Sequence, residues 1–124
     1  MRAGEIVRVN HHVDLLNYLL NREYKGFYKS YLRIDNNTMI WMVHFDNKLR
    51  QGWCNKIVGN RIIEEFHNVK KAPTNIGVGT TLTRRIVFEI TNNGYRFLGV
   101  YEFDAANSNL IHRELVKISD TYNF

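Results

Sequence analysis

The side chains of this chain that are best suited to binding a ligand gather between positions 39 and 55. The sequence there reads M-I-W-M-V-H-F-D-N-K-L-R-Q-G-W-C-N, and it holds both tryptophans and the single cysteine. If its two ends fold over one another, the indoles of Trp41 and Trp53 could flank a flat ligand. A base turned out of a nucleic-acid duplex needs two such walls, together with polar groups at its Watson–Crick edge.

Polar groups of the right kind stand close to both indoles. Asp46 could accept a hydrogen bond from an exocyclic amine, and the Asn55 amide could both donate and accept. A structural reading stays open, because Trp41 has apolar neighbours on a predicted strand and could belong to the core, whereas Trp53 follows a glycine and a polar loop. The candidate base or ligand pocket comprises Tyr31, Trp41, His44, Asp46, Trp53 and Asn55.

Positive charge is concentrated in the middle of the chain. The 124 residues include 17 basic and 12 acidic ones, for a net charge of +5, and residues 48–85 alone hold eight basic against two acidic residues. This surplus is typical of a surface that contacts a polyanion, most often nucleic acid, although a solvated face gives the same pattern. The candidate phosphate-binding residues are Lys48, Arg50, Lys56, Arg61, Lys70, Lys71, Arg84 and Arg85.

A long loop is expected over residues 67–79, which hold the only proline and two glycines. Residues 75–81 could present backbone N–H groups to a phosphate. They do not form a P-loop, because the glycines are not followed by Lys-Ser/Thr at the required spacing.

Catalytic patterns are weak throughout the sequence. Cys54 could use His44 or His67 as a base, but no family-type context surrounds the cysteine. Few carboxylates cluster in the way that a metal-dependent nuclease requires. We therefore expect no catalytic residues, no cofactor and no metal. A hydrolase that uses Asp46, Glu64 or Glu65 is a further alternative, after the two functions given below.

An aromatic strand face offers a second candidate surface near the C-terminus. It consists of Tyr95, Phe97, Tyr101 and Phe103. Sheets that stack single-stranded bases carry such faces, but the same rings could pack beneath a helix. We favour packing, because Phe97 and Phe103 have no other obvious core partners.

The pattern of apolar residues predicts the elements that must position these side chains. One short helix is expected over residues 13–20, with Asn10 as its N-cap, and Asn92-Asn93-Gly94 predicts a tight hairpin. Gly99 within its strand indicates a bulge or sharp bend. Strands are predicted over residues 5–9, 27–34, 38–45, 61–66, 80–91, 95–104 and 110–118. The fold class is therefore α+β, with a strongly bent antiparallel sheet or open β-barrel and a short N-terminal helix.

Length and composition fit a single domain over residues 1–124. Hydrophobic residues make up 44% of the chain and aromatic residues 13%, which is typical of a globular protein. Cys54 is the only cysteine, so no internal disulfide forms. The N-terminal residues have no long apolar run, and we expect neither a signal peptide nor a membrane partner and a cytoplasmic location.

The C-terminal third resembles a known kind of small domain. The pattern Y-R-F-L-G-V-Y-E-F-D followed by H-R-E-L-V-K-I-S is similar to the end of PUA-like and SRA-type (modified-cytosine-reading) barrels of bacterial or phage proteins linked to restriction. The position of W-C-N in the middle fits as well. In those barrels a strand with a central glycine precedes a last strand rich in Arg and Lys. Phe97-Leu98-Gly99 stands where SRA domains carry Tyr-Asp-Gly. The resemblance implies a PUA-like fold.

Together these patterns favour a non-catalytic nucleic-acid-binding module that reads a modified or flipped base, with DNA preferred over RNA. The alternative is a small phage or bacterial protein that acts by docking on another protein, for example by inhibiting a nuclease complex. Nucleic-acid binding would weaken with rising salt, whereas a docking protein would expose a contiguous apolar patch.

Overall fold

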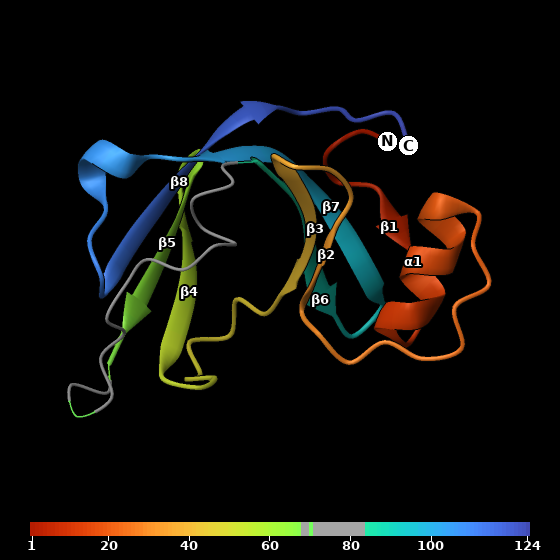
Figure 1. Cartoon of the computed structure of the whole chain (residues 1–124), viewed down its shortest axis with the longest axis horizontal. Coiled ribbons are helices and arrows are strands. Elements are labelled where there is room, and N and C mark those ends of the chain that lie inside the picture. The colour runs from red at the N-terminus through yellow and green to blue at the C-terminus, as the bar shows by residue number, and fades with distance from the viewer. Residues whose placement is uncertain (68–69, 71–83) are drawn as a thin grey trace.

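One curved sheet and one short helix make up the described chain (Figure 1). The computed structural model describes residues 1–67, Lys70 and residues 84–124. Within these residues, no helix is both long enough and apolar enough to cross a membrane. The elements in chain order are β1 (Ile6–Val7), α1 (His12–Leu20), β2 (Tyr31–Arg33), β3 (Thr38–Val43), β4 (Trp53–Val58), β5 (Arg61–Phe66), β6 (Arg84–Thr91), β7 (Gly94–Phe103), the 3-10 turn η2 (Ala105–Asn107) and β8 (His112–Ser119).

The strands pair in the order β2-β3-β6-β7-β8-β5-β4, and β1 pairs with β7. Figure 1 shows two limbs, one containing β2, β3 and β6 and the other β4 and β5, with the long strands β7 and β8 running between them. Within the described residues the edge strands β2 and β4 are not hydrogen-bonded to each other, so the sheet stays open. The predicted α+β class with a bent sheet and a short helix is confirmed, but the described strands do not close into a PUA-like barrel.

The prediction of an antiparallel sheet is wrong at one pair of strands. β3 and β6 run parallel, with Ile40 beside Ile86 and Val43 beside Glu89. Between these strands the chain visits the other limb, where it forms the β4–β5 hairpin, and it returns in the original direction. A parallel pair needs such a long crossover, and a residue pattern of period two does not encode strand direction.

Several predicted element boundaries also differ. Strand β4 was not expected, because Asn55 and Lys56 interrupt its apolar alternation, and β2 is much shorter than residues 27–34. The helix begins at His12 with His11, not Asn10, as its N-cap, and no side-chain hydrogen bond caps it. Residues 80–83 of the expected strand before Asn92 lie outside the described part.

Both faces of the sheet are covered by apolar residues. The helix residues Leu15, Leu16 and Leu19 pack on one face against Ile40 and Met42 of β3 and against their neighbours. On the opposite, concave face a second cluster contains Met39, Trp41, Val43, Ile62, Val87, Tyr101 and Leu115. Strand β3 is therefore buried on both faces.

A bulge in β7 moves the C-terminal aromatic residues onto different faces. Tyr95 and Phe97 join the cluster beneath the helix, as predicted, whereas Tyr101 joins the concave cluster. Val87 of β6 pairs with Gly99 and Phe88 pairs with Phe97, so Leu98 is an extra residue on β7 that accounts for this switch. Gly99 lies in the bulge with a φ of 131°, and a Cβ atom there would stand 2.6 Å from the carbonyl oxygen of Ser119.

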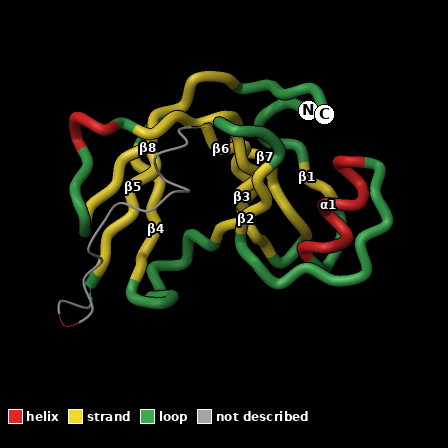
Figure 2. Tube along the Cα trace, in the orientation of Figure 1, coloured by secondary structure: helices red, strands yellow, loops and turns green. Residues whose placement is uncertain are grey.

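The two chain ends lie side by side (Figures 1 and 2). The Met1 amino group donates to the Tyr122 carbonyl oxygen at 2.6 Å, and Arg2 forms a β-bridge with Thr121. The N- and C-terminal segments therefore stabilise each other.

Replacing Gly99 by alanine is expected to lower the free energy of unfolding by about 2–4 kcal/mol, because the side chain meets both an unfavourable φ and the Ser119 carbonyl. Gly59→Ala is the matched control, since Gly59 also has a positive φ of 60° but has no atom within 4 Å of the new Cβ. We expect the control to lose about 1 kcal/mol. Urea denaturation measures both losses, and equal losses would contradict the proposed close approach.

Candidate functional site

A cavity of about 600 Å³ opens on the concave side, where the two limbs approach each other. One wall comes from β2 and β3, the other from β4 and β5, and the chain between β3 and β4 supplies the rim. Five of the six side chains predicted for the pocket line this cavity, namely Tyr31, Trp41, His44, Trp53 and Asn55. Asp46 lies outside the lining and contacts a lining residue, Arg50.

Each tryptophan carries an arginine guanidinium against its ring. The Arg85 guanidinium carbon lies 4.5 Å from the ring centroid of Trp41, and that of Arg113 lies 4.0 Å from the centroid of Trp53. Trp41 is buried, at 6% exposure, whereas Trp53 is half-buried and also contacts the Phe66 ring at 5.1 Å between centroids. Trp41 therefore belongs to the core and presents only a small surface to the cavity, as its strand position suggested.

A buried ion pair crosses the concave face. The Arg85 Nη1 atom donates to Glu64 Oε1 at 3.0 Å, and the two side chains are only 7% and 8% exposed. Arg85 lies on β6 and Glu64 on β5, and two strands separate these in the sheet order. The pair therefore joins the two limbs directly across the bend.

Glu64 is also the middle of a row of polar side chains. Cross-strand pairing sets Arg113 of β8 beside Glu64, and Glu64 beside Asn55 of β4. The Asn55 Oδ1 atom is buried and has no hydrogen-bond partner among the described residues. Buried amide oxygens are nearly always bonded, so the unpaired Oδ1 of this cavity-lining residue marks a place where a partner is expected.

The rim is held by a short hairpin between β3 and β4. Arg50 donates two hydrogen bonds of 2.7 Å to the Asp46 carboxylate, and its backbone exchanges two hydrogen bonds with Trp53. Gln51 and Gly52 form the two-residue turn between them, with φ values of 53° and 87°. The turn thus fixes the entry of Trp53 into β4.

Two histidines stand at the cavity with lowered basicity. Burial lowers the pKa of His44, and the positive charge of Arg50 lowers it further against an opposing effect of Asp46. Burial also lowers the pKa of His12, with added repulsion from His44, and its Nδ1 atom lies 2.5 Å from the Tyr95 hydroxyl. Arg50 in turn holds the pKa of the Asp46 carboxyl far below its usual range. The lowered pKa values favour the neutral form of both imidazoles at pH 7.

The predicted phosphate-binding residues fall into four groups. Arg50 pairs with Asp46, Lys56 with Glu65, and Arg61 with both Asp104 and Glu114. Arg85 is buried, which is a correction, because a phosphate contact needs an accessible guanidinium. Lys48, Lys70 and Arg84 are exposed. Lys71 and the stretch 75–81 lie outside the described residues.

Sequence reasoning missed the part that Glu64, Arg113 and His12 have in the site. A signal for Glu64 existed, because in R-I-I-E-E-F it shares the strand face of the buried Ile62, whereas Glu65 faces outward. A carboxylate at an inward strand position is unusual and indicates a specific partner. Within the described part of the chain, no group of three or more His, Cys, Asp or Glu side chains is arranged to hold a metal ion.

Comparisons with known proteins agree with this fold. The family model of the SET and RING associated (SRA) domain matches residues 1–124, which confirms the resemblance seen in the C-terminal strands. A search of curated proteins finds no match. Among solved structures, the 5-hydroxymethylcytosine-specific restriction enzyme AbaSI is similar, with a TM-score of 0.52 and 21% identity, covering 80% of this chain. The match spans 34% of the AbaSI chain, so this chain corresponds to about a third of that enzyme.

Glu64→Ala is expected to lower the free energy of unfolding by about 3–5 kcal/mol, because it leaves the Arg85 charge buried without its carboxylate. Glu65→Ala is the neighbouring control. It removes only an exposed pair with Lys56, so we expect a loss of at most about 1 kcal/mol. Urea denaturation of both variants gives the comparison, and a Glu64→Ala loss no larger than the control loss would show that the pair does not join the limbs.

Arg50→Ala is expected to raise the pKa of His44, because the change removes a nearby positive charge and leaves the Asp46 carboxylate without its guanidinium partner. An NMR titration of the imidazole rings measures the shift, and Arg96→Ala on the exposed side of β7 serves as the control. In the wild type, a lowered pKa means that protonation favours the unfolded chain. The folded chain therefore loses stability relative to the unfolded chain as the pH falls below 6.5, the ordinary pKa at which His44 of the unfolded chain binds a proton. An unchanged or lower His44 pKa in Arg50→Ala would contradict this account of the rim.

Proposed function

Because the chain belongs to the SRA domain family, we propose that it is a DNA-binding module that reads a modified base turned out of the duplex into the cavity between its limbs. The likeness to an enzyme described as specific for 5-hydroxymethylcytosine supports a base of this general class. In this proposal the described domain binds and positions DNA, and any cleavage belongs to another protein or domain.

The observation that carries the proposal is the unbonded Asn55 Oδ1 beside the Glu64 carboxylate. These are two hydrogen-bond acceptors on adjacent strands, and both line the cavity. Cytosine and adenine carry an exocyclic amine that donates hydrogen bonds, whereas thymine presents a carbonyl at that position. Burying an acceptor without a partner costs about 1–3 kcal/mol. An amine that donates to the Asn55 oxygen would remove this cost.

Aromatic walls support the same use of the cavity. Tyr31 and Trp41 are directly opposed on β2 and β3, and Trp53 stands on the other limb. Of these three rings, Tyr31 is the most accessible for stacking, at 41% exposure. A volume of about 600 Å³ lies within the usual range for small-molecule sites, which is about 300–1,000 Å³.

Exposed cations would hold the DNA backbone, and one of them, Lys48, lies on the chain between β3 and β4 that forms the rim. Lys48, Lys70 and Arg84 are exposed predicted phosphate contacts, and Arg50 and Lys56 are exposed as well but pair with Asp46 and Glu65. Such contacts position the duplex without reading its sequence, so discrimination between bases rests on the cavity. DNA is preferred over RNA in this proposal because the similar restriction enzyme is named for a modified DNA base.

The proposal predicts tighter binding to duplexes that carry a modified cytosine than to the same duplexes with cytosine. Fluorescence anisotropy with 5-methylcytosine, 5-hydroxymethylcytosine, N6-methyladenine and unmodified duplexes measures this preference, and an RNA duplex of the same sequence tests DNA against RNA. Asn55→Ala is expected to weaken binding of the preferred duplex by about 5- to 100-fold, as expected when a buried hydrogen bond is lost. Binding to a duplex with thymine at that position, which has no exocyclic amine, should change little.

Asn60→Ala is the matched control, because Asn60 is an exposed turn residue at the end of the same hairpin. It should bind every duplex as the wild type does. If the wild type binds no DNA at low salt, the proposal fails entirely. If it binds all duplexes equally, DNA binding stands but base reading does not.

A further inference from the structure

A second binding surface lies beside the cavity, on the chain that joins α1 to β2. This connecting segment, residues 21–30, has three basic side chains against one acidic one, Glu23. It carries Tyr24 and Tyr28, and Tyr31 follows directly; the three rings are 41%, 99% and 41% exposed. Interleaved tyrosines and lysines are typical of surfaces that bind single-stranded nucleic acid, where bases stack on the rings. The charge count over residues 48–85 did not point to this segment.

The connecting segment is held in place at both ends. The Asn17 side chain of α1 donates to the Tyr24 carbonyl at 3.0 Å and accepts from the Tyr24 N–H at 2.8 Å. At the other end, the Ser30 carbonyl accepts from the Met42 N–H of β3 at 2.7 Å, and Phe27 packs against the core between the two anchors. The exposed side chains are therefore presented from a fixed backbone, which lowers the entropic cost of binding.

A second cavity of about 500 Å³ lies along this segment. Its lining includes His11, Lys25, Phe27 and Tyr95, and it shares His12, Tyr28 and Ile90 with the first cavity. The two cavities are thus neighbours, and Tyr28 stands at the wall between them. A strand that places one base in the first cavity would pass Tyr28 at the next nucleotide.

We propose that the connecting segment binds the nucleotide next to the base held in the first cavity. Tyr28 stacks on the base of this nucleotide, and Lys25 and Lys29 contact the adjoining phosphates. The surplus of basic over acidic side chains calls for a negatively charged partner. A nucleic-acid strand supplies phosphates and stacking bases together, whereas a protein with an acidic surface would also need specific apolar contacts. A nucleic-acid strand is therefore favoured. The identity of the bound strand rests on the proposed function, whereas the second cavity and the exposed tyrosines do not.

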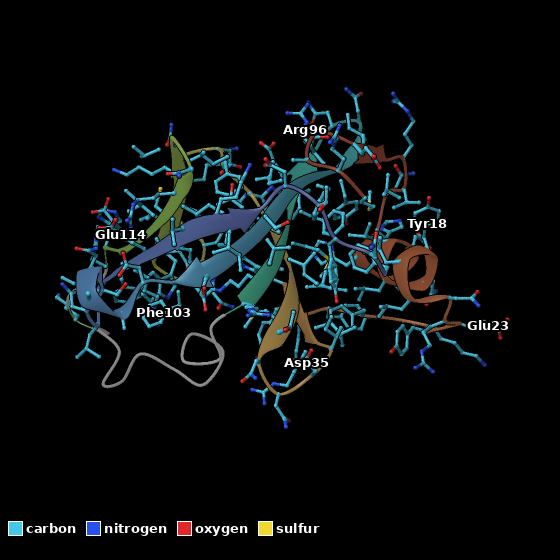
Figure 3. All side chains as sticks on the ribbon, turned by 90° about the horizontal axis from the view of Figure 1, so that it is seen from above. Tyr18, Glu23, Asp35, Arg96, Phe103 and Glu114 are labelled. Carbon is cyan, nitrogen blue, oxygen red and sulfur yellow. The ribbon has the colours of Figure 1, made fainter. Side chains whose placement is uncertain are left out.

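Tyr28→Ala is expected to weaken DNA binding by about 5- to 150-fold, the range measured when a stacking aromatic is removed. Tyr28→Phe keeps the ring and should restore most of the lost affinity. Tyr18→Ala is the matched control. Tyr18 is 67% exposed on α1 and lines neither cavity, and Figure 3 labels it on the helix. Both positions are exposed, so all three variants should fold.

The two lysines give an independent readout. The double variant Lys25→Ala/Lys29→Ala should make the plot of log affinity against log salt shallower by about 1–2, because each lost phosphate contact removes about 0.7–0.9 from the slope. Tyr28→Ala should leave this slope unchanged, since stacking releases no counterions. An unchanged slope in the double variant would overturn the assignment of the lysines to phosphates.

The outcomes separate this inference from the base-reading proposal. Tyr28→Ala should weaken binding of modified and unmodified DNA by the same factor and a thymine duplex likewise, whereas Asn55→Ala should weaken the cytosine duplexes and spare a duplex with thymine at that position. If the wild type does not distinguish the two duplexes but Tyr28→Ala still weakens both, base reading fails and the inference stands. If Tyr28→Ala binds like Tyr18→Ala, the inference is overturned whatever the cavity variants do. 2-Aminopurine placed next to the modified base gives a direct signal, which we expect to be quenched by the wild type and by Tyr28→Phe but not by Tyr28→Ala.

Discussion

The shape of this domain depends on one ion pair that is buried where a sheet would ordinarily bury apolar side chains. Glu64 and Arg85 come from opposite limbs and meet across the concave face at 3.0 Å. Neither charge tolerates the loss of the other, because an isolated buried charge is far more costly than a solvated one. The pair therefore sets the distance between the limbs, and it fixes the positions of Trp41 and Asn55, which flank it on β3 and β4. A purely apolar contact between the limbs would allow them to slide.

The cavity exists because the sheet bends without closing. A closed barrel of this size would fill its interior with side chains. Here the bulge at Gly99 turns β7 and also changes which face its residues point to, so that Tyr101 enters the concave cluster. The edge strands β2 and β4 then stand opposite each other as the two walls of a site. The same bend thus encloses the polar row of Arg113, Glu64 and Asn55 on the concave face and leaves the opening through which a ligand enters.

Much of this arrangement follows from sequence, and the remainder depends on contacts between distant residues. Period-two alternation and the Asn-Asn-Gly turn locate most strands, and the density of Trp, His and Asn around position 50 identifies the side chains that meet at the cavity. Strand direction is not encoded in such patterns, so the parallel pairing of β3 with β6 was missed. Charge counts also treat every arginine alike. Arg85 is engaged by Glu64, a carboxylate that only the tertiary fold brings near, whereas Arg50 pairs with Asp46 four residues before it in the chain. Tyr28 becomes notable only once its exposure is known.

The pairing of the two chain ends has a topological consequence. Because the Met1 amino group reaches the Tyr122 carbonyl and Arg2 bridges to Thr121, both ends leave the domain from one place, at the helix-bearing end of the sheet. A short linker would join them without strain, and the hairpin turn at Gly59-Asn60 on the distant limb offers new ends. The domain can accordingly be inserted whole into a surface loop of a host protein, or circularly permuted. In both cases the opening between the edge strands β2 and β4 keeps its geometry.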